Sequence, residues 1–349
     1  MVTEIRRHGL IENLPMIPYH SITTPLFCPT PVAPRSSIFL LLLFMLTLSA
    51  CALHTTSPPA DRAVPSTVRG SQLQGTVVEI ATQKTLSFEA FVKIVAQAQV
   101  VAVGEEHYHP DIQTFELRLL QALAQHRPQR VALAMEFLER DMQSAVDAYR
   151  SGNSDAATLQ TQIEATPAFI EYYFPFIQYA RQAGVPLLAL NVPRSLARRV
   201  TKEGLQAVTE SLLPPERAYM AATFLPITSQ YRTYFLQAVA AAHPLLEEQR
   251  DRFVEAAHLK DDTMAESLAV FLERAADMTV LAIAGRFHFD YGLAIPALLR
   301  QRRPHVTMQR VTTMAIAADD IIDLRDLARE ALADYVWFAP PHPETKAEN

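Results

Sequence analysis

Two short apolar runs, each broken by a glycine and followed by a histidine, constrain the fold of this 349-residue chain more than any other feature. The first is VVAVGEEH at residues 100–107, and the second is LAIAGRFH at residues 281–288. A continuous apolar run of this length that ends at glycine is typical of a strand buried on both faces, as in a parallel sheet. Ligands bind at the carboxyl ends of such strands, so we expect His107 and His288 to meet at one edge of the sheet.

Further apolar runs alternate with segments of helical periodicity along the rest of the chain. We expect additional strands at residues 76–82, 131–137, 185–191, 306–316 and 335–338. This alternation predicts an α/β fold with a mostly parallel central sheet flanked by helices. Residues 195–276 show helical periodicity broken by prolines and no strand pattern, so they are expected to form a helical insertion or lid.

Charge and motif content exclude several classes of function. The formal net charge is −6 and no basic block stands out, which argues against binding to nucleic acid. The sequence has no Gly-x-Gly-x-x-Gly, no Gly-x-x-x-x-Gly-Lys-Ser/Thr and no Gly-x-Ser-x-Gly motif. Dinucleotide binding, P-loop chemistry and serine hydrolysis of the usual type are therefore unsupported.

The N-terminal region carries a predicted targeting signal. Residues 38–50 form an apolar run that is short for a bilayer span, and Cys51 follows at once. Leu48-Ser49-Ala50-Cys51 resembles the lipobox of bacterial lipoproteins, in which the cysteine is lipid-modified and becomes the first mature residue. An uncleaved membrane anchor is the alternative. Both interpretations place the protein in the cell envelope, on the periplasmic side or at the outer membrane of a Gram-negative bacterium.

These features predict the organisation of the chain. The expected parts are a signal peptide at 1–50, a flexible tether at 51–75, a folded domain at 76–338 and a tail at 339–349. The region before Arg35 is long for a signal peptide, so Met16 is an alternative start. Removal of residues 1–50 also removes Cys28, which leaves the acylated Cys51 and no disulfide framework.

Polar side chains stand where the apolar runs end. Glu105 and His107 follow the first run, Glu136 closes the next and His288 follows the last. A buried carboxylate is costly unless it is paired or bound, so a strand has no structural need of one. Together these four residues could hold a divalent metal, act as a general base with its orienting partner, or line a pocket for a large ligand. The sequence leaves these alternatives open.

Each polar residue also has a purely structural interpretation. Glu105, Glu106 and Glu136 are placed to favour the dipole of the helix that follows each of them. Asn191, at the end of its strand, is a common turn residue, although Arg194 nearby suits a carboxylate or a propionate.

Two features away from the strand ends have structural interpretations as well. His258 and Asp262 lie four residues apart on a predicted helix, where such pairs usually face solvent. The aromatic residues between 169 and 179 are predicted to belong to the core.

Five segments resemble the ChaN-like haem-binding lipoproteins, in order and after the lipobox. They are GEEHYHPDIQ, ALAMEFLERDMQ, LLALNVPR, KDDTMAESL and AGRFHFDYG. The wider superfamily includes the Tiki metalloproteases, the TraB proteins and the erythromycin esterases. The resemblance covers about residues 76–338 and implies an α/β fold with a helical subdomain and a polar pocket at the strand ends.

The resemblance implies haem binding linked to iron acquisition. Glu105, His107, Glu136 and His288 match the shared Gly-x-x-His and Glu motifs. Axial ligation by Tyr or His is chemically reasonable. The candidate haem-contacting residues are His107, His288, Tyr291, Arg194 and His258.

We therefore expect a membrane-tethered lipoprotein that binds haem or a similar planar anionic ligand at the carboxyl ends of the strands. The alternative is a Glu/His hydrolase of the Tiki-like protease or esterase type, in which His107 or His288 activates water. A divalent metal held by Glu105, His107, Glu136 and His288 belongs to that alternative. The sequence does not decide whether the protein is an enzyme, and a homodimer is compatible with it.

Overall fold

The computed structural model describes residues 62–63, 67–240 and 246–343 of the chain. The predicted signal peptide at 1–50 and the predicted lipid-modified Cys51 lie outside the described residues. Among the helices that the structure describes, none has the length and apolar character needed to cross a membrane.

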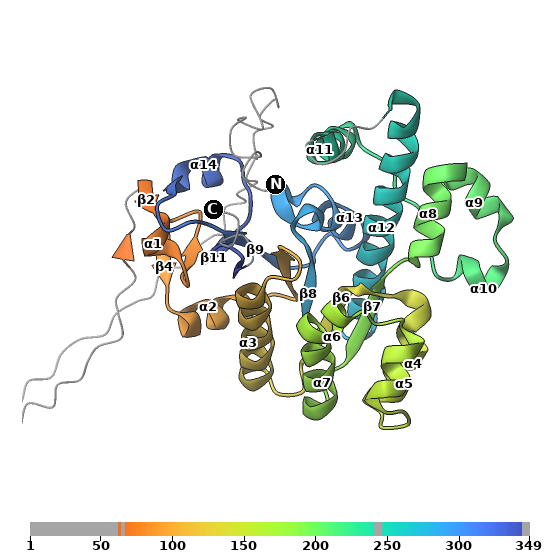
Figure 1. Ribbon diagram of the computed structural model, residues 1–349, viewed down its shortest axis with the longest axis horizontal. Coiled ribbons are helices and arrows are strands. Elements are labelled where there is room, and N and C mark those ends of the chain that lie inside the picture. The colour runs from red at the N-terminus through yellow and green to blue at the C-terminus, as the bar shows by residue number, and fades with distance from the viewer. Residues whose placement is uncertain (1–61, 64–66, 241–245, 344–349) are drawn as a thin grey trace, which may run out of the picture. The chain divides into compact units, whose positions relative to one another are not determined.

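The strands alternate with helices over most of the chain (Figure 1). The strands are β1 (Arg62–Ala63), β2 (Thr67–Arg69), β3 (Val77–Glu79), β4 (Lys84–Leu86), β5 (Val100–Glu105), β6 (Val131–Glu139), β7 (Leu187–Asn191), β8 (Thr279–Gly285), β9 (Met308–Ala315), β10 (Ile321–Asp323) and β11 (Tyr335–Ala339). The helices are α1 (Gly70–Leu73), α2 (Phe88–Val95), α3 (Pro110–His126), α4 (Gln143–Arg150), α5 (Ala156–Gln162), α6 (Pro167–Tyr172), α7 (Phe174–Ala183), α8 (Arg194–Glu203), α9 (Leu205–Ser211), α10 (Pro214–Arg217), α11 (Ser229–Ala240), α12 (Glu247–Arg274), α13 (Ile295–Arg302) and α14 (Leu324–Arg329). Short 3₁₀ turns are η1 (Arg140–Met142), η2 (Arg286–His288) and η3 (Asp290–Gly292).

A nine-stranded sheet has the order β1-β4-β3-β11-β9-β5-β8-β6-β7. The strands from β11 to β7 pair in parallel, and β3, β4 and β1 extend the sheet with antiparallel pairs. The predicted mostly parallel α/β fold is therefore confirmed. β5 and β8 are buried along their whole length, as their unbroken apolar runs predict.

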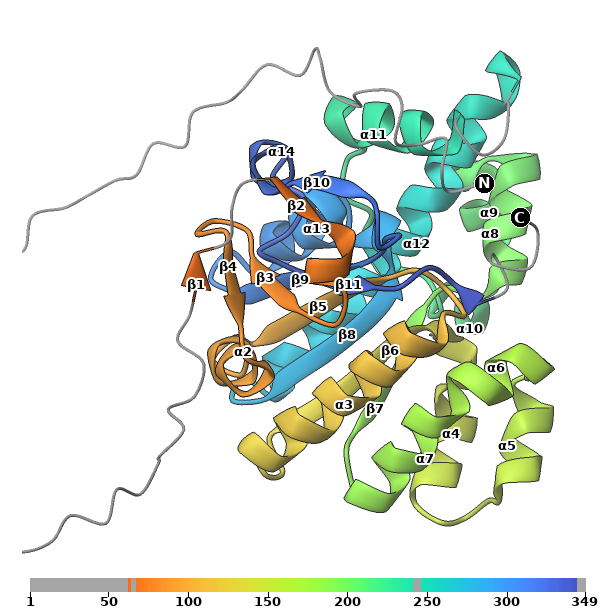
Figure 2. The ribbon, with the colours of Figure 1, turned by 60° about the vertical axis from the view of Figure 1, so that its left-hand side comes forward.

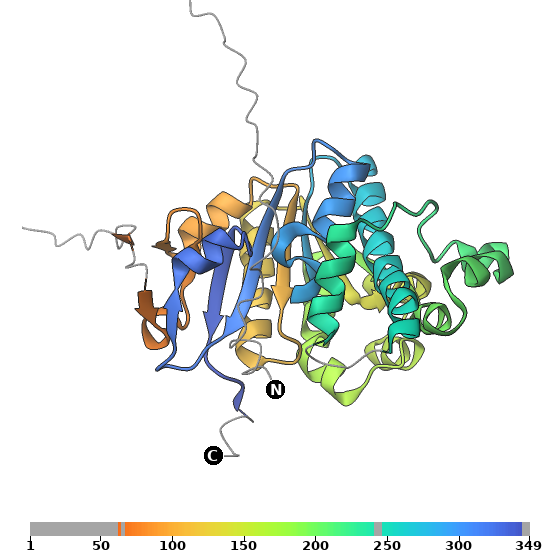
Figure 3. The ribbon, with the colours of Figure 1, turned by 90° about the horizontal axis from the view of Figure 1, so that it is seen from above.

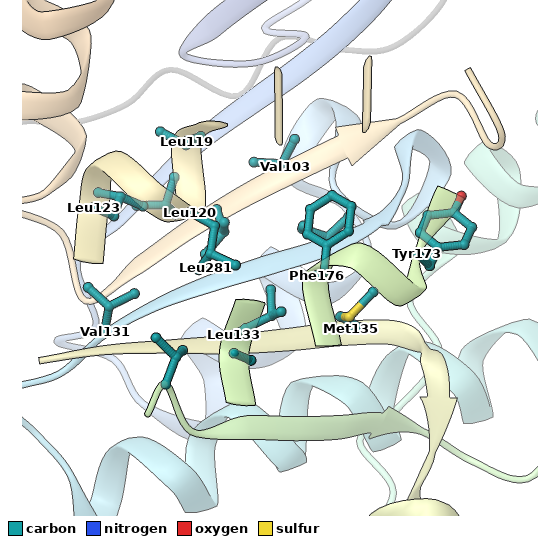
Figure 4. Close-up of a cluster of buried hydrophobic side chains, with 14 of the residues drawn as sticks. Val103, Leu119, Leu120, Leu123, Val131, Leu133, Met135, Tyr173, Phe176 and Leu281 are labelled. Carbon is teal, nitrogen blue, oxygen red and sulfur yellow. The ribbon is translucent and has the colours of Figure 1, made fainter. Parts of the chain in front are cut away.

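Helices cover both faces of the parallel part of the sheet (Figure 2). One face packs against α2, α3 and α7, and the opposite face packs against α12 and α13. On the first face, Val103, Leu133 and Leu281 of the strands meet Leu119 of α3 and Phe176 of α7 (Figure 4). The aromatic segment between 169 and 179 contributes Tyr173, Phe174 and Phe176 to this core, as predicted.

Local cap chemistry sets the ends of two helices. Ser87 caps α2 by accepting a hydrogen bond from the backbone N–H of Ala90 at 3.1 Å. Pro175 lies in the first turn of α7, and Gly184 ends that helix with a φ of +67°.

The folded part begins before residue 76, earlier than the sequence suggested. β2 pairs in antiparallel fashion with β10, and α1 follows it directly. Val68 and Leu73 are buried in a small core beside α14, so a segment that reads as a polar tether has two apolar anchors. Isolated apolar residues in a polar segment carry too little periodicity to reveal such pairing.

Helices α8 to α12 fill the stretch for which the sequence predicts helix and no strand. α8, α9 and α10 lie beside α12 and away from the sheet (Figures 1 and 3). α12 has 28 residues and packs against the sheet, against α8 and against α11, so it joins the insertion to the main core.

Candidate functional site

The candidate site lies at the carboxyl ends of β5, β6 and β8, which are neighbours in the sheet. β8 pairs with β5 on one side, where Glu105 stands opposite Gly285, and with β6 on the other side. Glu136 lies within β6, just after the regular pairing with β8 ends at Met135. Parallel pairing thus brings together the strand-end residues that the sequence singled out.

His107 is held by a buried carboxylate. Its Nδ1 lies 2.7 Å from Glu105 Oε1, and the side chain of His107 is 45% exposed whereas that of Glu105 is fully buried. Burial lowers the pKa of His107, but the hydrogen bond to Glu105 and the charges of Glu136 and Glu105 outweigh it and raise the pKa above 6.5. Its Nε2 forms no hydrogen bond with any residue in the described part of the chain.

Glu105 is itself fixed from two sides. Its Oε1 accepts a hydrogen bond from the hydroxyl of Tyr173 at 2.5 Å, and its Oε2 accepts one from Gln113 Nε2 at 2.8 Å. Glu116 is fully buried one turn further along α3. Burial and the charge of Glu105 hold the pKa of Glu116 well above its usual range.

His288 has a different environment. Its Nδ1 lies 2.5 Å from Asp261 Oδ1, and its Nε2 lies 3.1 Å from Glu136 Oε1. Burial lowers the pKa of His288, but the charges of Glu136 and Asp261 and the hydrogen bonds to them raise it to about 10. His288 is therefore an imidazolium at neutral pH, with both ring nitrogens donating and no lone pair to offer.

Glu136 joins the two halves of the site. Its Oε2 accepts a hydrogen bond from the backbone N–H of Gly285 at 2.8 Å, while its Oε1 faces His288. Burial raises the pKa of Glu136, but the charge and hydrogen bond of His288, with further charges from Lys260 and His107, bring it well below its usual range. Glu136 is a carboxylate at any physiological pH.

Gly285 leaves the space in which these groups meet. A Cβ at this position would lie 2.8 Å from His107 Cε1, 3.0 Å from His107 Nε2 and 3.6 Å from Glu136 Oε2. The absence of a side chain on β8 therefore allows the imidazole of His107 to lie against the strand beside Glu136.

Glu106 points into a separate network beside the site. Its Oε1 accepts from the backbone N–H of Ala315 at 3.2 Å and lies 3.3 Å from Arg286 NH1. Arg286 also bonds to Asp290, whose other oxygen accepts from the hydroxyl of Thr312 at 2.6 Å. Glu106 and Arg286 thus join the ends of β5, β8 and β9, which is a structural role.

Aromatic rings surround the exposed face of His107. The His107 ring meets Phe137 edge-on at 5.2 Å and Tyr108 at 6.2 Å. Phe137 stacks on Tyr173 at 3.9 Å, and Tyr108 contacts Tyr172 at 5.8 Å. Tyr108 is 40% exposed, so this face presents an aromatic surface to solvent next to an accessible imidazole.

Three residues predicted to contact haem lie outside the cluster formed by Glu105, His107, Glu136 and His288. Arg194 is paired with Glu139, whose carboxylate accepts hydrogen bonds from the backbone N–H and from the Nε of Arg194. Arg194 also lines a cavity of about 450 Å³, together with Glu164. Tyr291 is half-buried and packs on Tyr234. His258 lies inside the helical insertion.

The expectation that His258 and Asp262 face solvent is wrong. Their exposed fractions are 1% and 0%. α12 is covered on several sides, so the middle of this helix has no solvent face. Burial lowers the pKa of His258 and keeps it neutral against the ring of Tyr231, and Asp262 binds Arg302.

The sequence did not single out several residues that complete the site. Asp261 orients His288 and accepts from the hydroxyl of Tyr231 at 2.5 Å, while Tyr173 and Gln113 fix Glu105. The doublet Asp261-Asp262, within the family-like segment KDDTMAESL, was the signal available for Asp261. Tyr173 was hidden among other aromatic residues.

Within the described ranges, no group of three or more His, Cys, Asp or Glu side chains has an arrangement that could hold a metal ion. The carboxylates near His107 and His288 instead form hydrogen bonds with the imidazoles and with backbone N–H groups.

The parallel strands end in two imidazoles, each hydrogen-bonded to a buried carboxylate, so this α/β protein has a polar cluster at the carboxyl ends of its strands. Residues 91–299, more than half of the chain, match the family described as haem-binding uptake, Tiki superfamily, ChaN. The chain belongs to this family, and the resemblance found in its sequence motifs is confirmed.

Known proteins similar to this chain include ChaN of Campylobacter jejuni, whose solved structure is described as showing cofacial haem binding. It has a TM-score of 0.57 and 20% identity, and the match covers 75% of this chain and 95% of that one. This likeness supports the fold. An erythromycin esterase, EreC, in its open conformation has a TM-score of 0.40 and 14% identity, over 70% of this chain and 77% of that chain.

A curated relative is the protein RETICULATA-RELATED 5, chloroplastic, of Arabidopsis thaliana. It is 21% identical over 301 residues, which are 81% of this chain and 39% of the relative. The chain thus spans about two fifths of the length of this curated relative.

Proposed function

We propose that this protein binds haem at the carboxyl ends of its sheet strands, where His107 would hold the iron. One observation carries the proposal: His107 is accessible, its Nδ1 is fixed by Glu105, and its Nε2 is unpaired among the described residues. Imidazoles that bind metals typically donate their other N–H to a carboxylate, which orients the ring and raises its basicity. His288, with both nitrogens engaged, lacks such a lone pair.

The surroundings of His107 fit a planar, anionic macrocycle. Tyr108 and Phe137 provide aromatic surface against which a porphyrin ring can pack. Lys260 is close enough to Glu136 to lower its pKa and forms no ion pair with a carboxylate in the described residues, so it is our candidate partner for a propionate. Bound haem would supply the iron centre; the chain supplies orientation and charge.

Membership of the haem-binding uptake family supports haem as the ligand, as does the haem bound by ChaN of Campylobacter jejuni. We further propose that the protein is held at a bacterial membrane by a lipid on Cys51, where it handles haem for iron acquisition. The lipobox-like segment that ends at Cys51 supports this part of the proposal.

The test is a visible-absorption titration of ferric haem into protein that starts after Cys51. We expect a saturable, shifted Soret band for the wild type and loss of most of this affinity in His107→Ala. His305→Ala is the control, because His305 is exposed before the amino end of β9, at the opposite edge of the sheet. Equal affinities for wild type and His107→Ala would remove His107 as the ligand.

An acid–base hydrolase is the second candidate function. The observation that favours it is the convergence of His107 and Glu136 on the space left by Gly285. There His107, oriented by Glu105, could take a proton from water, and the backbone N–H of Gly285 keeps Glu136 in place. Turnover of ester or peptide substrates that His107→Ala abolishes, in a protein without a specific haem spectrum, would favour this candidate over haem binding.

A further inference from the structure

The end of the described chain lies across the turn that carries His107. After β11, the carbonyl of Pro340 accepts a hydrogen bond from His109 Nε2 at 2.9 Å. His342 Nε2 lies 3.0 Å from the carbonyl oxygen of Tyr108 and donates to it. The rings of His109 and His342 meet edge to face, with centroids 5.3 Å apart and planes at 88°. We name residues 340–343 the C-terminal strap.

The turn under the strap has a conformation that needs support. Tyr108 has a φ of +59°, in the left-handed region that residues with a side chain rarely adopt. Its backbone is held on both sides, because its N–H donates to the hydroxyl of Tyr173 at 3.4 Å and its carbonyl accepts from His342. Strained backbone of this kind persists when its surroundings over-determine it, and it is concentrated at functional sites.

The strap and Glu105 act on the same short segment. Tyr173 links them, because its hydroxyl accepts from the N–H of Tyr108 and donates to Glu105, the carboxylate that holds His107. His109, which is 2% exposed, anchors the far end of the turn to Pro340. His107 is therefore fixed through its side chain by Glu105 and through its backbone neighbours by the strap.

We propose that the C-terminal strap is a positioning element of the site, in which His342 holds the His107–Tyr108 turn in the geometry that binds ligand. This inference takes the identity of the ligand from the proposed function. The positioning of the turn by His342 does not depend on which ligand binds. His342 and Tyr108 are 234 positions apart, so this hydrogen bond joins the C-terminal end of the domain to the turn after β5.

The first experiment measures ferric-haem affinity in variants of the full mature chain. His342→Ala should weaken binding about fivefold, the effect of losing roughly one hydrogen bond. His342→Gln is the rescue variant, since its amide nitrogen can donate to the same carbonyl, and it should bind within about twofold of wild type. If His342 positions the turn, His342→Gln should recover haem affinity even where its free energy of unfolding stays equal to that of His342→Ala. If the contact is purely structural, haem affinity should not recover without a recovery of the unfolding free energy.

The second experiment needs no haem. Amide hydrogen exchange of residues 105–109 should be about tenfold faster in His342→Ala than in wild type, with the rest of the sheet unchanged. The inference is overturned if residues 105–109 exchange in His342→Ala at the wild-type rate. It is also overturned if His342→Ala loses haem affinity and His342→Gln does not recover it. If the wild type binds no haem, the proposed function fails, and exchange in the 105–109 turn still decides whether the strap positions it.

Discussion

At the scale of the residue, the two histidines that follow the glycine-broken strands differ in how many of their ring nitrogens are engaged. His288 donates from both nitrogens to Asp261 and Glu136 and has a pKa of about 10. His107 has one carboxylate partner and an open Nε2 at the surface. The shared Gly-x-x-His pattern thus produces one ring with both nitrogens engaged and one ring with a single carboxylate partner, because the number of carboxylates that hydrogen-bond to each ring differs.

Gly285→Ala should separate function from stability at this site. The backbone of Gly285 has a φ of −53°, which alanine adopts without strain. The new Cβ would lie too close to the far end of the His107 ring and in ordinary contact with Glu136 Oε2. We expect the ring to move, the haem affinity to fall by about tenfold or more, and the free energy of unfolding to change by less than about 1 kcal/mol. Haem titration and urea denaturation measure the two effects; wild-type affinity in this variant would contradict the assigned geometry.

The charge of His288 should appear in the pH dependence of stability. Its folded pKa of about 10 lies above the ordinary value of 6.5, so its stabilising contribution is complete below pH 6.5 and is lost as pH rises to about 10. His288→Gln should flatten the decline of unfolding free energy across that window, measured by urea denaturation at a series of pH values. His305→Gln, at an exposed position, should keep the wild-type slope. An unchanged slope in His288→Gln would show that His288 is not the group that titrates.

At the scale of the element, β7 shows how this protein closes an open sheet edge. β7 is the last strand of the sheet, and an unpaired edge is a template for association with another chain. The side chain of Gln143 lies along it, donating to the carbonyl of Leu187 at 3.0 Å and accepting from the N–H of Ala189 at 2.8 Å. One side chain from α4 thus replaces a neighbouring strand over these residues.

Gln143→Ala should therefore destabilise the fold although the residue is only partly buried. It leaves the carbonyl of Leu187 and the N–H of Ala189 without partners, which we expect to cost about 1–2 kcal/mol. Chemical denaturation measures the loss, and light scattering reports any association through the opened edge. Gln125→Ala, at an exposed position on α3, should change stability by less than about 0.5 kcal/mol. A similarly small change for Gln143→Ala would show that water satisfies the edge as well as the side chain does.

At the scale of the whole molecule, α12 connects the helical insertion to the site. It supplies Asp261 to His288 and packs against the sheet, α8 and α11 at once. A segment that the sequence predicts to be an insertion thus contributes a hydrogen-bond partner to the site at the strand ends. Ligand at the site and packing of the insertion are expected to stabilise each other, since both act through the same helix.

Attachment to a membrane is a prediction of the same scale. If Cys51 carries a lipid, Cys51→Ser should move the protein from the membrane fraction to the soluble fraction and abolish labelling by a radioactive fatty acid in a bacterial host. Cys28→Ser is the matched control and should leave both unchanged, since residue 28 lies within the predicted signal peptide. Membrane retention of Cys51→Ser would instead support an uncleaved anchor at residues 38–50.

The sequence by itself determined the parallel strands, their order of alternation with helices and the residues at the strand ends. Unbroken apolar runs identify β5, β6, β7 and β8, and the polar residues that follow mark where each strand ends. In β5 and β8 a glycine also marks this point. Capping at Ser87 and Gly184 is equally local, so it too follows from sequence. These features depend on periodicity and backbone preference within one segment.

Only the tertiary structure decided which histidine has both ring nitrogens engaged and which has one open nitrogen. Asp261 reaches His288 from α12, 27 positions away, Glu136 reaches it from β6, and His342 reaches Tyr108 from the end of the chain. The burial of His258 was decided in the same way. A pKa and a hydrogen-bond partner depend on groups brought close by packing of distant segments, and no local pattern in the chain encodes that proximity.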